Sequence, residues 1–189
     1  YVPGPEAAIS STHLTLSANY QQRGDEWERP VHVEFFEDGG ALAVSQDAGM
    51  RINGNYAREY HQKSLRLHAR SRYGLDTFDH RFFPEKQVDR FGTILLRSAS
   101  SDIFTAMVRD AVIQSLSTGL GFETQSYRPV VVFINGDYWG IQLLRDRYDA
   151  DYIRQHHGID AADLDMLLIP PGADNVEPGA DQPYQAMLD

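Results

Sequence analysis

Alternating apolar and polar positions predict several short strands in the first third of the chain. Residues 31–37 (VHVEFFE) are β-branched and aromatic, and Asp38-Gly39-Gly40 follows them as a typical hairpin turn. Residues 41–45 are expected to form the returning strand. Residues 50–53 make a further short apolar-polar run that ends at Gly54.

Residues 63–69 (KSLRLHA) alternate strictly, which predicts a half-buried strand. This period of two places Lys63 on the core-facing side, together with Leu65, Leu67 and Ala69. A lysine that faces the core is costly unless its charge finds a partner. One interpretation is that Lys63 extends out of the sheet at the strand end. The other is that its ammonium group is held above the sheet to meet phosphate oxygens.

One longer helix is predicted in the middle of the chain, after a short strand at 93–96. Ser101 or Asp102 can cap its start, and Gly119 or Gly121 can end it. Its apolar stripe, which we expect to pack on the sheet, consists of Ile103, Phe104, Met107, Val108, Ala111, Val112 and Leu116.

The last third of the chain predicts a hairpin and a short helix. Residues 130–134 and 138–144 flank Asn135-Gly136, which strongly favours a type I′ turn. Asp149 or Asp151 can start a helix that closes at Gly158. Residues 164–169 read as one more apolar strand. This order predicts an α+β fold with a mainly antiparallel sheet and one packed helix, and argues against alternating βαβ units.

Composition narrows the function classes. The 189 residues include no cysteine, which excludes disulfides, zinc-thiolate sites and thiol nucleophiles. The net charge of −10 is opposite to that of a typical nucleic-acid or anionic-membrane binder, although Arg66, Arg70 and Arg72 leave a local basic patch open. No apolar stretch reaches the roughly 18 residues that span a bilayer. The chain begins at Tyr1, so we expect a processed or excised piece.

Four further residues are candidates for chemistry, each with a plainer alternative. Gly54 and Arg58 could bring backbone amides and a charge to a phosphate, or form an ordinary turn. Asp110 lies at the edge of the helix stripe and could pair with Lys63, or be a solvated, locally paired acid. Asp146 lies between two arginines, and its plainer interpretation is a surface acid. Its functional interpretation depends on the resemblance given below. The histidines lack metal-binding spacing, and no GxSxG motif occurs.

Taken together, several segments resemble the CotH kinase-like family, which is named for spore coat protein H. The matching residues are Trp27-Glu28-Arg29-Pro30, Arg51-Ile52-Asn53-Gly54-Asn55-Tyr56-Ala57-Arg58, Gln62-Lys63-Ser64-Leu65-Arg66-Leu67, Leu96-Arg97, Arg109-Asp110-Ala111, Asn135-Gly136-Asp137-Tyr138-Trp139-Gly140 and Arg145-Asp146-Arg147-Tyr148. They span residues 27 to about 170.

The resemblance implies a protein-kinase-like fold that binds ATP and Mg²⁺ between two lobes. It implies a secreted or cell-surface bacterial protein that phosphorylates extracytoplasmic proteins. By the same resemblance, Gly54 and Arg58 would form the phosphate-facing turn and Lys63 the phosphate-binding lysine. Asp110 would lie on the αC-like helix as the partner of Lys63, and Asp146 would take the hinge position that docks adenine.

The resemblance also suggests a domain division. Residues 1–26 would be an N-terminal segment and residues 27–148 a kinase-like N-lobe. Residues 149–189 would follow the hinge and begin a C-lobe that is cut short. The family's catalytic and metal-binding aspartates belong to the second lobe, beyond the matched segments, so we expect this portion alone to be inactive.

Two rival functions remain open at this stage. The chain could be a non-catalytic binding or assembly module of a cell-surface protein. Its contact surface for glycan or protein would then be made of the aromatic residues Trp27, Tyr56, Tyr73, Tyr138 and Trp139. A hydrolase whose active residues lie downstream is the weaker rival.

Overall fold

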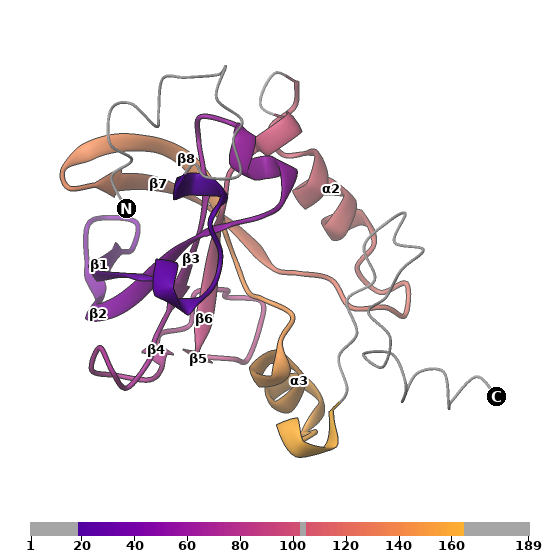
Figure 1. Cartoon of the computed structure of the whole chain (residues 1–189). Coiled ribbons are helices and arrows are strands. Elements are labelled where there is room, and N and C mark those ends of the chain that lie inside the picture. Colours follow the sequence, from indigo (N-terminus) through magenta and orange to yellow (C-terminus); the bar gives the residue numbers. More distant parts are fainter. Residues whose placement is uncertain (1–18, 103–104, 165–189) are drawn as a thin grey trace, which may run out of the picture. The chain divides into compact units, whose positions relative to one another are not determined.

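A computed structural model describes residues 19–102 and 105–164 of the chain. The chain divides into two compact units, Tyr1–Arg147 and Tyr148–Asp189. The first unit contains one six-stranded sheet, a two-stranded sheet and a helix (Figure 1). The predicted α+β fold with a mainly antiparallel sheet is confirmed, since every strand pair in it is antiparallel.

The large sheet has the strand order β1-β2-β3-β6-β8-β7. Its strands are β1 (Arg29–Phe36), β2 (Leu42–Asn53), β3 (Ser64–His68), β6 (Thr93–Arg97), β7 (Tyr127–Ile134) and β8 (Asp137–Arg145). Neighbours along the chain are mostly neighbours in the sheet, and the exception is the exchange of β7 and β8. The strand that leads out of the first unit, β8, therefore lies between β6 and β7.

Both predicted hairpins are confirmed. Residues 37–41, which include the predicted turn at 38–40, connect β1 to β2, and β2 continues unbroken to Asn53, so the two runs predicted at 41–45 and 50–53 belong to a single strand. Asn135 and Gly136 connect β7 to β8 with φ angles of 52° and 84°. Positive φ at both central positions is what a type I′ turn requires, and asparagine and glycine tolerate it best.

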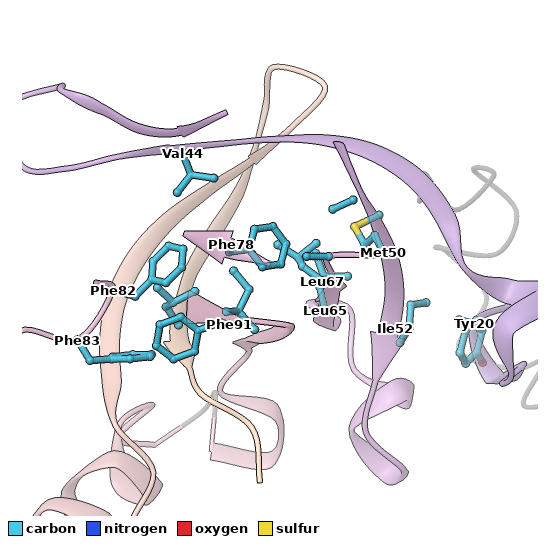
Figure 2. Packing of buried hydrophobic residues seen from close by; sticks show 14 residues of the cluster. Tyr20, Val44, Met50, Ile52, Leu65, Leu67, Phe78, Phe82, Phe83 and Phe91 are labelled. Carbon is cyan, nitrogen blue, oxygen red and sulfur yellow. The ribbon is translucent and has the colours of Figure 1, made fainter. Parts of the chain in front are cut away.

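The hydrophobic core lies on one face of the sheet (Figure 2). Directly opposed residues in antiparallel strands share a face, and one such row is Ile52, Leu65, Leu96 and Leu144. A second part of this core comes from β4 (Phe78–Asp79), β5 (Arg90–Phe91) and the segment between them, and it was not predicted. The buried aromatic residues of this part are Phe78, Phe82, Phe83 and Phe91.

The opposite face of the sheet carries several arginines. The row of opposed residues beside the first one consists of Arg51, Arg66, Leu95 and Arg145, one from each of four adjacent strands. Strand alternation therefore places an apolar row on the core face and a row with three arginines on the other.

The middle helix differs from its prediction. Residues Ser100–Asp102 form a short 3₁₀ turn, and helix α2 spans only Arg109–Leu116. Met107 adopts a left-handed φ of 58°, which interrupts a right-handed helix. The carboxylate of Asp102 accepts a hydrogen bond from the backbone N–H of Arg109 at 3.1 Å, so it closes the intervening loop rather than starting a helix at once.

The predicted packing of the whole apolar stripe is also wrong for the described residues. Ala111 is buried, but Val112 is 45% exposed and Leu116 is 77% exposed. Ile103 and Phe104 lie outside the described residues. Tertiary contacts of α2 therefore rest on Ala111 and on charged side chains, and not on a full hydrophobic face.

The second unit contains the short helix that the sequence predicts. Helix α3 spans Ala150–His157, and the Asp149 side chain accepts a hydrogen bond from the backbone N–H of Tyr152 at 3.1 Å. Gly158 ends the helix in the left-handed conformation, with φ of 70°. A 3₁₀ turn at Ala161–Asp163 follows, and the strand predicted for 164–169 extends beyond the described residues. Over the two described ranges, no helix is both long and apolar enough to cross a bilayer.

Candidate functional site

The Lys63 side chain is buried, as its strand parity predicts, with 7% of the residue exposed. Its ammonium nitrogen Nζ donates to the carbonyl oxygens of Arg58 at 2.6 Å and of Tyr60 at 2.5 Å. The same nitrogen lies 4.4 Å from the centre of the Tyr20 ring, within cation–π range. Burial lowers the pKa of Lys63, because it penalises the charged form. The hydrogen-bond partners of Lys63 are thus carbonyl oxygens, while the neighbouring Glu59 charge opposes the lowering of its pKa.

The Arg58 side chain also makes its hydrogen bonds to backbone carbonyl oxygens. It lies in the 3₁₀ helix Tyr56–Glu59 and is 6% exposed. Its guanidinium group donates to four carbonyl oxygens, those of Ile52 at 2.5 Å, Gly54 at 2.7 Å, Tyr20 at 2.8 Å and Gln22 at 3.0 Å. Four of the five N–H groups of Arg58 are therefore engaged within the fold.

Gly54, Arg58 and Lys63 form one hydrogen-bonded assembly at the turn between β2 and β3. Gly54 has a φ of +101°, a conformation that other residues rarely adopt. The assembly fixes this turn by saturating backbone carbonyls with buried charged donors, which are stronger than neutral ones. The phosphate-binding roles expected for these three residues stay predictions, and each would require the present contacts to be exchanged.

Asp110 does not pair with Lys63, so that part of the prediction is wrong. Its oxygen Oδ2 lies 2.7 Å from Nη2 of Arg145, at the end of β8. The same oxygen lies 3.4 Å from Nε of Arg97, at the end of β6. The helix carboxylate is therefore held to the sheet by two arginines of adjacent strands.

Asp146 is buried, with 1% exposed, and is not the surface acid that the alternative interpretation expected. Its oxygen Oδ2 accepts a hydrogen bond from Nζ of Lys86 at 2.5 Å. Gln125 links Asp146 to Arg145. Its Nε2 donates to the Asp146 carbonyl at 3.0 Å, and its Oε1 accepts a hydrogen bond from Nη1 of Arg145 at 3.2 Å. A continuous polar network thus runs from Asp110 through Arg145 and Gln125 to Asp146.

The structure therefore separates the predicted site residues into two groups. Gly54, Arg58 and Lys63 are joined at the β2–β3 turn, whereas Asp110 and Asp146 are joined by the network at the end of β8. Arg97 and Arg145 were not predicted as partners of Asp110. The alternation of β6 and β8 offered a signal, because both arginines follow apolar runs at the strand ends.

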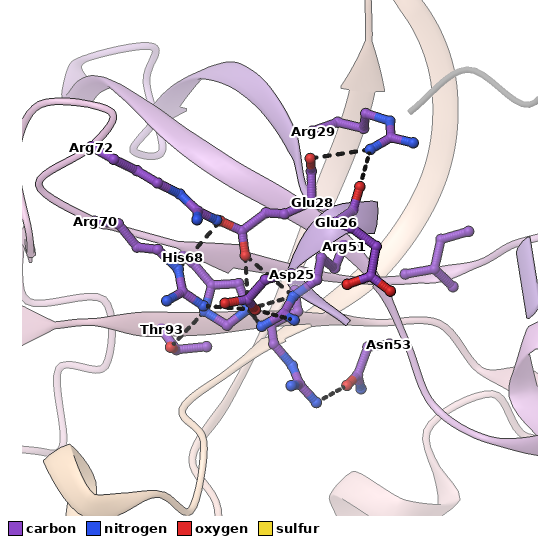
Figure 3. A network of polar contacts seen from close by, with 12 residues as sticks. Asp25, Glu26, Glu28, Arg29, Arg51, Asn53, His68, Arg70, Arg72 and Thr93 are labelled. Atoms are coloured by element: carbon purple, nitrogen blue, oxygen red, sulfur yellow. Dashed lines mark hydrogen bonds and ion pairs between the residues drawn. The ribbon is translucent and has the colours of Figure 1, made fainter. Parts of the chain in front are cut away.

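A third charged cluster surrounds Glu28, whose side chain is fully buried (Figure 3). Its carboxylate meets Nε of Arg51 at 3.2 Å, Nε of Arg70 at 3.2 Å and Nη2 of Arg72. Burial alone would raise the pKa of Glu28, but hydrogen bonds from Arg72 and Tyr73 outweigh it and lower the pKa. Two arginines of the basic patch left open by the sequence, Arg70 and Arg72, thus pair with a buried acid, whereas Arg66 donates to the Asn53 side chain.

His68 completes this cluster as a neutral side chain. Its Nε2 accepts a hydrogen bond from Arg51 at 3.0 Å, and its Nδ1 lies 3.2 Å from the Thr93 hydroxyl. Burial and the neighbouring Arg51 charge lower the pKa of His68 from 6.5 to about 3. No local sequence signal pointed to Glu28 or His68, because their partners come from distant segments.

The aromatic surface expected by the rival hypothesis is only partly present. Tyr56 is 74% exposed and Tyr138 is 63% exposed, whereas Trp27, Tyr73 and Trp139 are half-buried. Tyr138 stacks edge-on against Phe133, with ring centres 5.8 Å apart. The exposed aromatic residues thus lie in separate elements, the turn before β3 and the β7–β8 hairpin.

Comparison with known proteins gives one positive result. The model of the family described as "CotH kinase protein" matches residues 50–180. This range contains both groups of predicted site residues. No curated protein matches the chain. Among the described residues, no group of three histidine, cysteine or acidic side chains is placed to hold a metal ion.

Proposed function

Because the chain belongs to the CotH kinase protein family, we propose that it forms the nucleotide-binding portion of a kinase. The reaction would transfer phosphate from ATP to a protein outside the cytoplasm. The observation that carries this proposal is the family match, which covers both groups of predicted site residues. The extracytoplasmic location of enzyme and substrate rests on the resemblance described above.

The position of Asp146 supports the nucleotide-binding part of the proposal. The chain passes from the first compact unit to the second directly after Arg147, one residue beyond Asp146. In a protein kinase the segment that joins two lobes holds the adenine ring. Here the corresponding backbone is fixed by the Lys86–Asp146 ion pair and by the amide of Gln125. A segment fixed in this way is a preorganised surface for a planar base.

Phosphoryl transfer depends mainly on positioning and on charge stabilisation, to which Mg²⁺ contributes when it is bound with ATP. The described residues offer half-exposed cationic and anionic side chains, Arg97 and Asp110, beside this segment of the chain. They do not offer a cluster of metal ligands, so we assign no described residue to the metal.

A binding module is the second candidate, and one observation favours it. The β7–β8 hairpin carries exposed apolar residues in directly opposed pairs, Val131 with Ile141 and Phe133 with Tyr138. Exposed apolar patches of this kind mark interaction surfaces. The patch is also compatible with a kinase that docks its substrate there.

Calorimetric titration of the full-length protein separates the two candidates. The kinase proposal predicts saturable, one-to-one binding of Mg-ATP. Soluble cell-wall oligosaccharides should give no heat under the same conditions. Binding of an oligosaccharide without binding of Mg-ATP would overturn the kinase proposal in favour of the binding module.

A further inference from the structure

A nucleotide-binding site needs a cation that can reach phosphate oxygens. In protein kinases this cation is a strand lysine, and a carboxylate on helix αC holds it in place. Two conditions can therefore be applied to the basic residues of this chain. The side chain must be accessible to a ligand, and an acidic side chain of a helix must orient it.

The buried cations do not meet these conditions. Lys63 and Arg58 are 7% and 6% exposed, and both donate to backbone carbonyls. Arg145 does contact the helix carboxylate of Asp110, but it is only 1% exposed and also binds Gln125. Moving any of these groups onto a ligand would leave buried polar atoms without partners, at a substantial cost.

Arg97 meets both conditions. It is the last residue of β6, and its side chain is 45% exposed. Its Nε lies 3.4 Å from Oδ2 of Asp110 in α2. Within the described part of the chain, the guanidinium group of Arg97 makes this ion pair through Nε.

The surroundings of Arg97 are built to keep this pair in place. Asp110 is anchored independently by the buried Arg145 at 2.7 Å, so its position does not depend on Arg97. A guanidinium group held at Nε still presents two Nη atoms, which match the geometry of two phosphate oxygens.

We propose that Arg97 is the side chain of this unit that contacts the phosphates of ATP, with Asp110 orienting it and Arg145 anchoring Asp110. This inference rests on the proposed function. It moves the phosphate-contacting role from Lys63 to Arg97 and gives Lys63 a purely structural role.

The test compares ATP with adenosine, which shares the base and ribose but has no phosphate. Affinities of the full-length protein are measured by calorimetry for wild type, Arg97→Ala and Arg97→Lys. The matched control is Arg90→Ala, which removes another exposed arginine of the same unit that is paired with an aspartate, Asp79. Thermal melting of each variant reports whether the fold is kept.

Arg97→Ala should weaken ATP binding by about tenfold or more, as expected for loss of a hydrogen bond between charged groups. Its adenosine affinity should match that of wild type, Arg97→Lys should recover part of the ATP affinity, and Arg90→Ala should change neither. Unchanged ATP affinity in Arg97→Ala, or equal losses for ATP and adenosine, would overturn the assignment while leaving the proposed function intact. If wild type itself binds no ATP, the proposed function fails, and the assignment fails with it.

Discussion

At the scale of single residues, the two cations Lys63 and Arg97 show how burial decides a role. Strand parity correctly predicts that Lys63 points inward, and a buried ammonium group must find partners. The sequence suggested an anion as that partner, but nearby carbonyls of the same turn supply it. Such contacts depend on backbone conformation between residues 54 and 60, which residue alternation does not encode.

The first prediction concerns Lys63→Met, which keeps an unbranched side chain one atom shorter and removes its charge. Two carbonyl groups would lose a charged donor, so the free energy of unfolding should fall by about 1–3 kcal/mol. Adenosine and ATP affinities of the folded variant should stay within about threefold of wild type, a change worth less than 1 kcal/mol. Urea denaturation and calorimetry measure the two quantities. A stable variant that no longer binds ATP would restore Lys63 as the phosphate ligand.

The second prediction follows from the lowered pKa of His68. The unfolded chain takes up a proton near the ordinary pKa of 6.5, whereas the folded protein does so only near 3. Stability is therefore fully present above pH 6.5 and is lost as the pH falls from 6.5 toward 3, by up to about 1.4 kcal/mol per pH unit from this group.

Replacement of the histidine by His68→Gln should make the free energy of unfolding less dependent on pH within that window. Urea denaturation at several pH values between 4 and 7 measures the slope. His61→Gln, at an exposed histidine of the same unit, is the control and should leave the slope as in wild type. Equal slopes in wild type and His68→Gln would contradict a buried neutral His68.

At the scale of elements, the sequence predicts what short-range chemistry determines. The Asn135-Gly136 turn and helix α3, with its Asp149 cap and Gly158 end, are set by a few adjacent residues, and both were predicted. The middle helix was predicted, but its start at Arg109 was not, because the left-handed Met107 and the Asp102 loop closure depend on a wider context than the apolar stripe. The pairing of β4 with β5 escaped prediction for the same reason, since two residues per strand carry no period.

The third prediction concerns Gly49 of strand β2, which lies against the Glu28 carboxylate. A Cβ atom at Gly49 would lie 2.2 Å from Oε1 of Glu28 and 2.6 Å from the Tyr73 ring. Gly49→Ala should therefore displace the carboxylate from Arg70 and Arg72, and lower the free energy of unfolding by about 2 kcal/mol.

A double-mutant cycle with Glu28→Ala identifies the cause. If the clash is with the Glu28 carboxylate, Gly49→Ala should cost clearly less in the Glu28→Ala background than in wild type. Denaturant unfolding of the four proteins measures the coupling. Additive effects would show that Glu28 is not the group displaced.

At the scale of the whole molecule, the antiparallel α+β fold and the family were predicted from the sequence, and the roles of the site residues stay predictions. Gly54, Arg58 and Lys63 lie together because they are close in sequence. The link between Asp110 and Asp146 depends on Arg145 and Gln125, which meet because the β7–β8 hairpin places Tyr127 opposite Arg145. The contact of Arg97 with the same Asp110 also requires β6 to lie beside β8. This sheet order is a long-range property, which sequence periodicity alone could not predict.

A kinase must bind ATP before it can transfer phosphate, so nucleotide binding is the central claim of the proposed function. Titration of the full-length protein with Mg-ATP in a calorimeter tests it most directly. Our account predicts saturable binding with one site per chain, and a loss of about tenfold or more in affinity when Arg97 is replaced by alanine. Absence of any Mg-ATP binding by the folded wild-type protein would contradict it.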